Sequence, residues 1–232
     1  MKEISISAQK IGEFFGFPIT NTFLLSLFFS FFLFIIFFLT FKRTSLYPSK
    51  YQNFFDWILE TLLKYFESLV GEKQTAKEIF PIASTLFLYI LFCNLSEIIP
   101  LSAISHYWRT PSSDLNFTLS LAIFSMIYIH LLAIKKLGPF NYLKKFIKPK
   151  NPILTFAGIL EIFGEMSRII SLSLRLFGNL FAGSVLLGFV SLIFYFLFPL
   201  PFLLLEILVA FVQALIFSSL VVIFYSSSIK IH

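Results

Sequence analysis

The chain has 232 residues, of which 58% are hydrophobic and 13% are charged, whereas soluble domains carry roughly 25% charged residues. This composition excludes an ordinary soluble protein and predicts an integral membrane protein in contact with the lipid bilayer. The net charge of +6 does not predict a nucleic-acid partner, because most basic residues lie in residues 42–77 and 135–150. The single Cys93 excludes an intramolecular disulfide and argues against a metal site, and we expect no cofactor.

The first membrane span is predicted at residues 22–41, an uncharged stretch with the length that one crossing of the hydrocarbon core needs. Residues 1–21 should lie outside, because the basic pair Lys42 and Arg43 follows the span instead of preceding it. Residues 42–78 alternate charged residues with apolar ones at helical spacing. This pattern predicts an amphipathic helix on the cytoplasmic surface.

Two further spans are predicted at residues 80–99 and 116–134, with an outer loop between them. A second basic loop follows the third span. Because basic loops remain on the cytoplasmic side of a membrane, both should be cytoplasmic, with the N-terminus outside and the C-terminus inside.

The last two helices are predicted at residues 152–198 and 202–228, with Pro199 and Pro201 marking a turn between them. The first of these stretches is about twice the length of one crossing. One long tilted helix or two segments with a break would both explain it. The predicted fold is therefore an all-α membrane domain over residues 1–232, with about five hydrophobic helical units ending in a long tilted hairpin.

Each of the last two helices carries a polar stripe on one face, because residues three and four apart lie above one another on a helix. The first stripe consists of Glu161, Arg168, Ser171, Arg175, Asn179 and Ala182. The second consists of Glu206, Ala210, Gln213 and Phe217. Two such stripes on antiparallel helices should meet or flank a common partner.

Arg175 is the most informative residue, because an arginine keeps its charge in a protein and costs about 2.5 to 3.5 kcal/mol at the centre of a membrane helix. One explanation is a buried ion pair with Glu206, although the desolvation of such pairs often cancels their attraction. The other is an ion or proton pathway. Small residues, among them Gly178, Gly183 and Gly188, also predict close approach by another helix.

The remaining polar residues receive less specific interpretations. His130 is expected to have a packing or interfacial role near the cytoplasmic end of the third span, and Glu97 and His106 are expected to be solvated span ends. Lys144, Lys145, Lys148 and Lys150 predict contact with lipid headgroups or with a peripheral stalk.

Three segments resemble subunit a of the F-type ATP synthase, in a form more bacterial than mitochondrial. These are residues 171–183 (S-L-S-L-R-L-F-G-N-L-F-A-G), residues 205–217 (L-E-I-L-V-A-F-V-Q-A-L-I-F) and residues 110–116 (T-P-S-S-D-L-N). The resemblance implies a multi-pass subunit of the bacterial inner membrane, with the c-subunit ring and peripheral stalk b subunits as partners. It implies no nucleotide site in this chain itself.

The resemblance also implies residue roles. Arg175 matches the arginine that faces the rotating ring, promotes deprotonation of the ring carboxyl and blocks leakage between two offset half-channels. Asn179 and Gln213 match its neighbours, and Glu206 matches an acidic or histidine position. Ser184 stands where the family usually has Glu or His.

We expect Glu206, Ser184 and Asp114 to belong to the outer access path, with Asp114 at its mouth. Glu161 and Arg168 would line the inner exit, unless they form a structural pair. The alternative function is a self-contained secondary transporter with Arg175 and Glu206 at its site, although the paired repeats common in that class are not visible.

Overall fold

The computed structural model describes residues 10–14, 17–41, 50–97, 109–146, 152–193 and 199–229. Residues 42–49 of the first basic loop, residues 98–108 of the outer loop with His106, and the residues Lys148 and Lys150 lie outside the described residues. Five described helices are long and apolar enough to cross a membrane, namely α1 (Asn21–Phe41), α3 (Lys73–Leu95), α5 (Leu115–Leu137), α7 (Pro152–Ile193) and α8 (Pro199–Ile229). The predicted class, a helical membrane protein, is confirmed.

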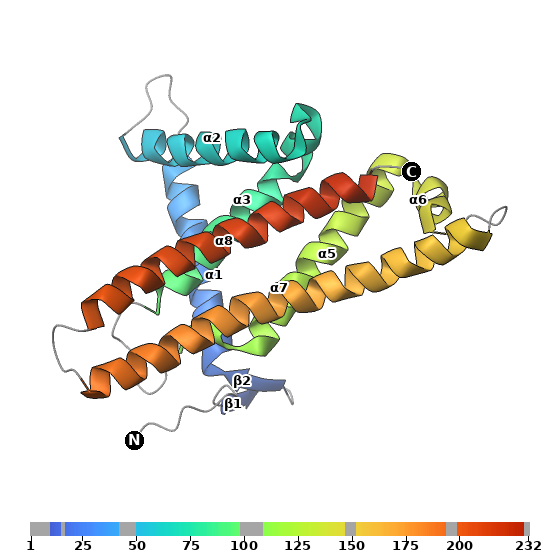
Figure 1. The fold of residues 1–232 in the computed structure, drawn as a ribbon. Coiled ribbons are helices and arrows are strands. Elements are labelled where there is room, and N and C mark those ends of the chain that lie inside the picture. The colour runs from blue at the N-terminus through green and yellow to red at the C-terminus, as the bar shows by residue number, and fades with distance from the viewer. Residues whose placement is uncertain are drawn as a thin grey trace.

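The other elements are short or lie at the ends of the spans. They are the helices α2 (Lys50–Val70) and α6 (Pro139–Phe146), the 3-10 turn η1 (Pro111–Ser113) and the strands β1 (Lys10–Phe14) and β2 (Phe17–Thr20). The two strands form an antiparallel hairpin directly before α1, which the sequence analysis did not predict. In Figure 1 this hairpin and α2 lie at opposite ends of the molecule.

The amphipathic helix α2 ends at Val70, and α3 begins only three residues later at Lys73. Gly71 between them has a φ of 77°, a left-handed conformation that glycine adopts without steric cost. The helix α3 therefore starts seven residues before the span expected from residue 80. Its first turns expose Lys73 and Lys77, so these charges did not mark a helix boundary.

The helix α7 is continuous over 42 residues, which corresponds to a length of roughly 63 Å. Of the two alternatives for this stretch, the structure therefore has one long helix. The return helix α8 begins at Pro199, earlier than expected, and Pro201 lies in its first turn. Prolines fit there because the first backbone N–H groups of a helix have no intrahelical acceptor.

The long helices α7 and α8 lie side by side, both steeply inclined to α1 (Figure 1). A helix twice as long as the bilayer core is thick can remain in the membrane only when tilted. Buried Leu172, Leu176 and Leu180 of α7 pack into the same core as Val221 and Tyr225 of α8. The inclined pair is thus anchored to α3 and α5 by apolar contacts.

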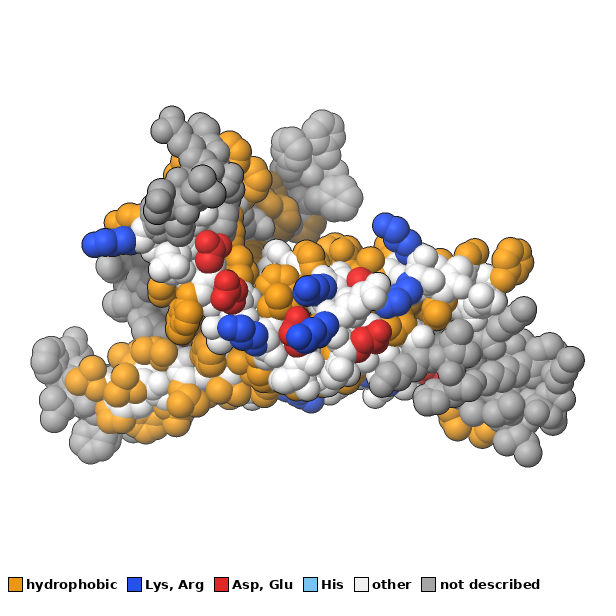
Figure 2. All heavy atoms as spheres, turned by 90° about the horizontal axis from the view of Figure 1, so that it is seen from above, with side chains coloured by type: hydrophobic (Ala, Val, Ile, Leu, Met, Phe, Trp, Pro, Cys, Tyr) orange, Lys and Arg blue, Asp and Glu red, His pale blue; other side chains and the backbone are white. Residues whose placement is uncertain are grey.

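A polar junction joins three helices near the α2 end. The Glu78 carboxylate of α3 accepts hydrogen bonds from Lys136 Nζ of α5 at 2.8 Å and from the Tyr225 hydroxyl of α8 at 2.6 Å. Figure 2 looks onto this end and shows acidic and basic side chains gathered at its centre, with hydrophobic side chains dominating the arms. The charges are therefore concentrated where a membrane surface would lie.

Candidate functional site

The polar stripe of α7 faces out of the chain. Ser171, Arg175 and Asn179 are all exposed, whereas Leu172 and Leu176 on the other side of the helix are buried. Ile170 and Leu174 beside the arginine are more than half exposed, at 54% and 51%. Arg175 is therefore a charge on an apolar outer surface, which in a membrane requires a partner outside this chain.

The polar stripe of α8 faces into the chain. Glu206 and Gln213 are each only 4% exposed, and Ala210 and Phe217 on the same face are also buried. Among the described residues, the two polar stripes contact each other through one hydrogen bond. In this bond Gln213 Nε2 donates to the backbone oxygen of Arg175 at 3.1 Å.

The ion pair between Arg175 and Glu206 is not formed. Both Glu206 carboxylate oxygens are buried and have no hydrogen-bond partner among the described residues. The carboxylate lies against Gly183 of α7, where an added Cβ atom would be 3.0 Å from Glu206 Oε1. The absence of a side chain at Gly183 thus lets the carboxylate approach α7 closely, one helical turn or more from Arg175.

Glu97 is the residue that the sequence analysis missed. It follows the end of α3, and its carboxyl lies near Ser184, Glu206 and Arg109, while the Ser184 hydroxyl donates to the Phe181 backbone oxygen at 2.9 Å. Its Oε2 atom is buried without a hydrogen-bond partner in the described part of the chain. Glu97 is therefore partly buried at the end of its span. We call Glu97, Ser184 and Glu206 the outer carboxyl cluster, after the outer access path expected for Ser184 and Glu206.

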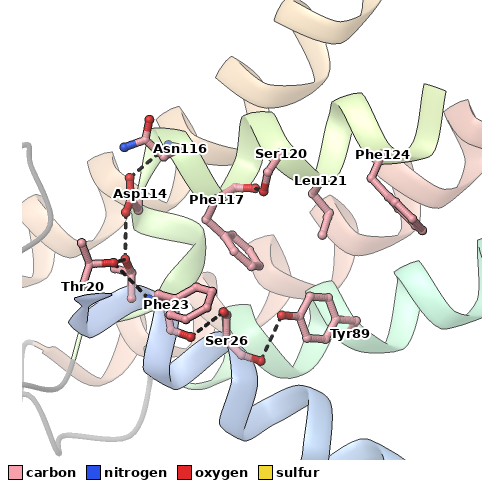
Figure 3. A pocket seen from close by; sticks show the side chains of 11 residues that line it. Thr20, Phe23, Ser26, Tyr89, Asp114, Asn116, Phe117, Ser120, Leu121 and Phe124 are labelled. Carbon is pink, nitrogen blue, oxygen red and sulfur yellow. Dashed lines mark hydrogen bonds between the residues drawn. The ribbon is translucent and has the colours of Figure 1, made fainter. Parts of the chain in front are cut away.

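Asp114 lies at the N-terminus of α5 and is only 6% exposed. Its Oδ1 accepts from the Asn116 backbone N–H at 3.0 Å, and its Oδ2 accepts from the Thr22 hydroxyl of α1 at 2.8 Å (Figure 3). The aspartate thus caps α5 and ties it to α1. It borders a cavity of about 460 Å³ between α1, α3 and α5, whose lining includes Ser26 and Tyr89. A role at the mouth of an access path stays a prediction.

The two residues expected at the inner exit lie on α7, toward its N-terminal half. The Arg168 guanidinium carbon is 4.7 Å from the centre of the Phe224 ring of α8. Glu161 lies close enough to Tyr142 of α6 for its charge to act on that phenol. Among the residues that the structure describes, no three His, Cys, Asp or Glu side chains converge to hold a metal ion.

Comparison with known proteins gives consistent matches over most of the chain. The family model described as ATP synthase A chain matches residues 22–226. ATP synthase subunit a of Legionella pneumophila strain Philadelphia 1 is 35% identical over 218 residues, which cover 94% of this chain and 90% of that protein. ATP synthase subunit a of Nitratiruptor sp. is 34% identical over 82% of this chain and 81% of its own length. ATP synthase subunit a of Geobacter sulfurreducens is 34% identical over 82% of this chain and 79% of its own length. The resemblance stated from the sequence is confirmed, and the chain belongs to the ATP synthase subunit a family.

Proposed function

We propose that this chain conducts protons through two offset half-channels that it forms against a c-subunit ring. The observation that carries the proposal is the outward, exposed position of Arg175 on an apolar surface of α7. A self-contained pathway would need the charged group to face its own helices. A rotating partner instead needs the charge to face outward.

The ring carboxyl can pass through lipid only in its neutral form. When it reaches Arg175, the fixed positive charge favours the carboxylate and releases the proton. The same charge repels a hydronium ion, so it separates the two half-channels. The hydrogen bond from Gln213 to the Arg175 backbone supports this role because it holds the arginine in register with α8.

The outer half-channel would run through the outer carboxyl cluster, with Asp114 nearer its mouth. Glu97 supplies a second titratable group beside Ser184, where the sequence lacks the acid expected in the family. The inner half-channel would run along Glu161 and Arg168 toward the basic end of the chain. This arrangement requires the N-terminus outside and the C-terminus in the cytoplasm of a bacterial inner membrane.

The driving force acts on each transferred charge with about 2.3 kcal/mol per 100 mV of membrane potential. One charge is far too little for the synthesis of one ATP, so several transfers must accumulate in the rotating ring. The peripheral stalk b subunits would keep this chain from rotating with the ring. Asn179, one turn from Arg175 and also exposed, would contact the ring directly.

The test is Arg175→Ala in the complete ATP synthase, with ATP-driven proton pumping measured in inverted membrane vesicles. We expect coupled pumping to be lost while ATP hydrolysis by the catalytic head continues. Lys64→Ala is the matched control, because Lys64 is an exposed cation on α2. Coupled pumping that persists in the Arg175 variant would rule out the proposed role.

The alternative of a self-contained transporter is separated by reconstituting this chain alone in liposomes. A transporter would move its ion without other subunits. Subunit a should give no coupled flux until the ring is added, because Arg175 has no described carboxylate partner within its own chain.

A further inference from the structure

A second cluster of titratable side chains lies between α5, α6 and α7, apart from the outer carboxyl cluster. We call this end of the molecule, where the basic residues of α5 and α6 lie, the basic end. His130 of α5 has its Nδ1 atom 2.5 Å from the Tyr142 hydroxyl oxygen of α6. Its Nε2 atom is 3.5 Å from Glu165 Oε2 of α7. We call His130, Tyr142 and Glu165 the basic-end triad. The packing or interfacial role expected for His130 from the sequence does not explain why both ring nitrogens face proton-exchanging groups.

The triad is partly accessible, which distinguishes it from a core network. The His130 side chain is 28% exposed and the Glu165 side chain is 13% exposed, whereas Tyr142 is buried. Burial, together with the negative charges of Glu165 and Glu161, raises the pKa of the Tyr142 phenol above its ordinary value. The phenol therefore keeps its proton and serves as a fixed hydrogen-bonding group for the imidazole.

The helix α7 carries two carboxylates near the triad and also Arg168, whose guanidinium lies over the Phe224 ring of α8. Glu165 and Glu161 approach from α7, whereas Lys136, on the same helix as His130, is paired with Glu78 of α3. The described part of α8 carries Glu206 as its one acidic residue, which lies far along that helix in the outer carboxyl cluster. Glu165 is therefore the carboxylate that the structure places against the imidazole, with its Oε2 atom 3.5 Å from His130 Nε2.

The triad also lies on the route that the proposed function needs. Glu161 and Glu165 are one helical turn apart on α7, so a proton on the polar side of this helix can reach either carboxyl. Histidine is the side chain that exchanges protons most readily near neutral pH. A purely structural contact would not need an acid and an imidazole that are both partly exposed and lie 3.5 Å apart.

We propose that the basic-end triad is the proton-exchange station of the inner half-channel, with His130 as its acceptor. A proton moves from the protonated Glu165 carboxyl to His130 Nε2, which leaves a carboxylate and an imidazolium. The imidazolium then gives this proton to water at the exposed part of the ring and returns to its neutral form. Tyr142 accepts from Nδ1–H throughout and is a positioning residue. This inference rests on the proposed function, because it extends the same inner path.

The experiment uses membrane vesicles that carry the complete membrane sector with the catalytic head removed, and measures passive proton conduction as a function of pH on the basic-end side. His130→Ala should lower conduction about tenfold, less than the roughly hundredfold or larger contribution of an acid–base group at the reacting atoms. Added imidazole should restore conduction in this variant only. His130→Gln should lower it similarly and flatten the pH profile, without loss of ring assembly.

Glu165→Gln should also lower conduction and flatten the pH profile, whereas Tyr142→Phe should shift the profile with a smaller loss. Tyr128→Phe on α5 is the matched control for the phenol. The proposal is overturned by an unchanged pH profile in assembled His130→Gln complexes, or by a loss that imidazole does not rescue in assembled His130→Ala complexes. If His130→Ala does not assemble, the His130→Gln profile alone decides.

Vesicles that retain the catalytic head, in which ATP-driven pumping is measured, separate this inference from the proposed function. If Arg175→Ala retained coupled pumping, the role of Arg175 would fail whatever His130 does. If pumping requires Arg175 but His130→Gln conducts normally at every pH, the proposed function stands and only the triad proposal fails.

Discussion

The polar stripes of α7 and α8 have similar residue spacing but opposite environments. Arg175 and Asn179 of α7 are exposed, whereas Glu206 and Gln213 of α8 are almost completely buried. A stripe that faces outward is available to another chain, whereas a stripe that faces inward contacts only its own helices. Periodicity alone identifies a polar face of a membrane helix, but the packing of the whole bundle decides what that face meets.

The two stripes also differ in how their polar groups are satisfied. Gln213 has a definite acceptor in the Arg175 backbone, whereas the Glu206 oxygens have no hydrogen-bond partner in the described ranges. Buried polar groups without a partner cost free energy and are retained where function requires them. The buried stripe therefore contains one amide with a structural contact and one carboxyl group whose oxygens make no hydrogen bond within the described ranges.

The largest expected effect in the buried stripe comes from Glu206→Gln. An amide cannot release and accept protons as a carboxyl does, so we expect ATP-driven pumping to fall by about a hundredfold, as for a positioned acid–base group. Glu97→Gln should give a smaller loss, because Glu97 contacts the path through Ser184. Glu60→Gln, an exposed acid on α2, is the control in the same pumping measurement.

Combining the Glu97→Gln and Glu206→Gln substitutions tests whether the outer carboxyl cluster acts as a unit. Neighbouring groups that share one task give non-additive effects in double mutants. The double variant of Glu97 and Glu206 should therefore pump no worse than Glu206→Gln alone. Losses that multiply would contradict a shared proton path through these two residues.

A smaller effect is expected from Gly183→Ala, which places a methyl group 3.0 Å from Glu206 Oε1. Overpacking of this kind typically costs about 1 to 3 kcal/mol, and the carboxyl must move away from α7. We expect several-fold slower pumping with little change in ring assembly. Gly188→Ala is a close control on the same helix, since a Cβ at that position meets nothing within 4 Å.

An equal loss of pumping in the two glycine variants would contradict a specific contact between Gly183 and Glu206. It would indicate instead that the outer surface of α7 tolerates no added methyl group against the ring. The comparison of the two glycines thus separates a contact inside this chain from one made with the partner.

The spans could be predicted from the sequence because apolar length reports directly on the bilayer. The ends of α3 and α8 could not, because Lys73 sits in an exposed first turn and Pro199 begins a helix instead of preceding it. The β1–β2 hairpin was missed because its strands are short and polar residues interrupt them. Such boundaries depend on local geometry that hydropathy does not encode.

The candidate site residues divide in the same way into those that the sequence could indicate and those that it could not. Arg175, Glu206 and Gln213 were found because they interrupt apolar helices at helical spacing. The contact between Glu97 and Ser184 joins helices distant in the chain, and the contact between His130 and Glu165 does the same. No periodicity within one helix could have revealed either contact, since both depend on the packing of α3, α5 and α7.

The smallest and most selective effect is expected from a matched pair of amide substitutions, Gln213→Leu and Asn179→Leu. Gln213→Leu removes the hydrogen bond to the Arg175 backbone, which should lower the stability of the isolated subunit by about 1 kcal/mol. Asn179 is exposed, so its replacement should change that stability by less than about 0.5 kcal/mol. Thermal unfolding of the purified subunit in detergent measures both.

Pumping by the complete complex should respond to both amide variants, although only one of them is destabilised. Gln213→Leu would act by loosening the position of Arg175, and Asn179→Leu by altering the surface that meets the ring. If Asn179→Leu left pumping unchanged while Gln213→Leu reduced it, the ring would have to contact a face of α7 other than the one that carries Asn179. The outward stripe would then be a consequence of packing, and only the buried stripe would belong to the proton path.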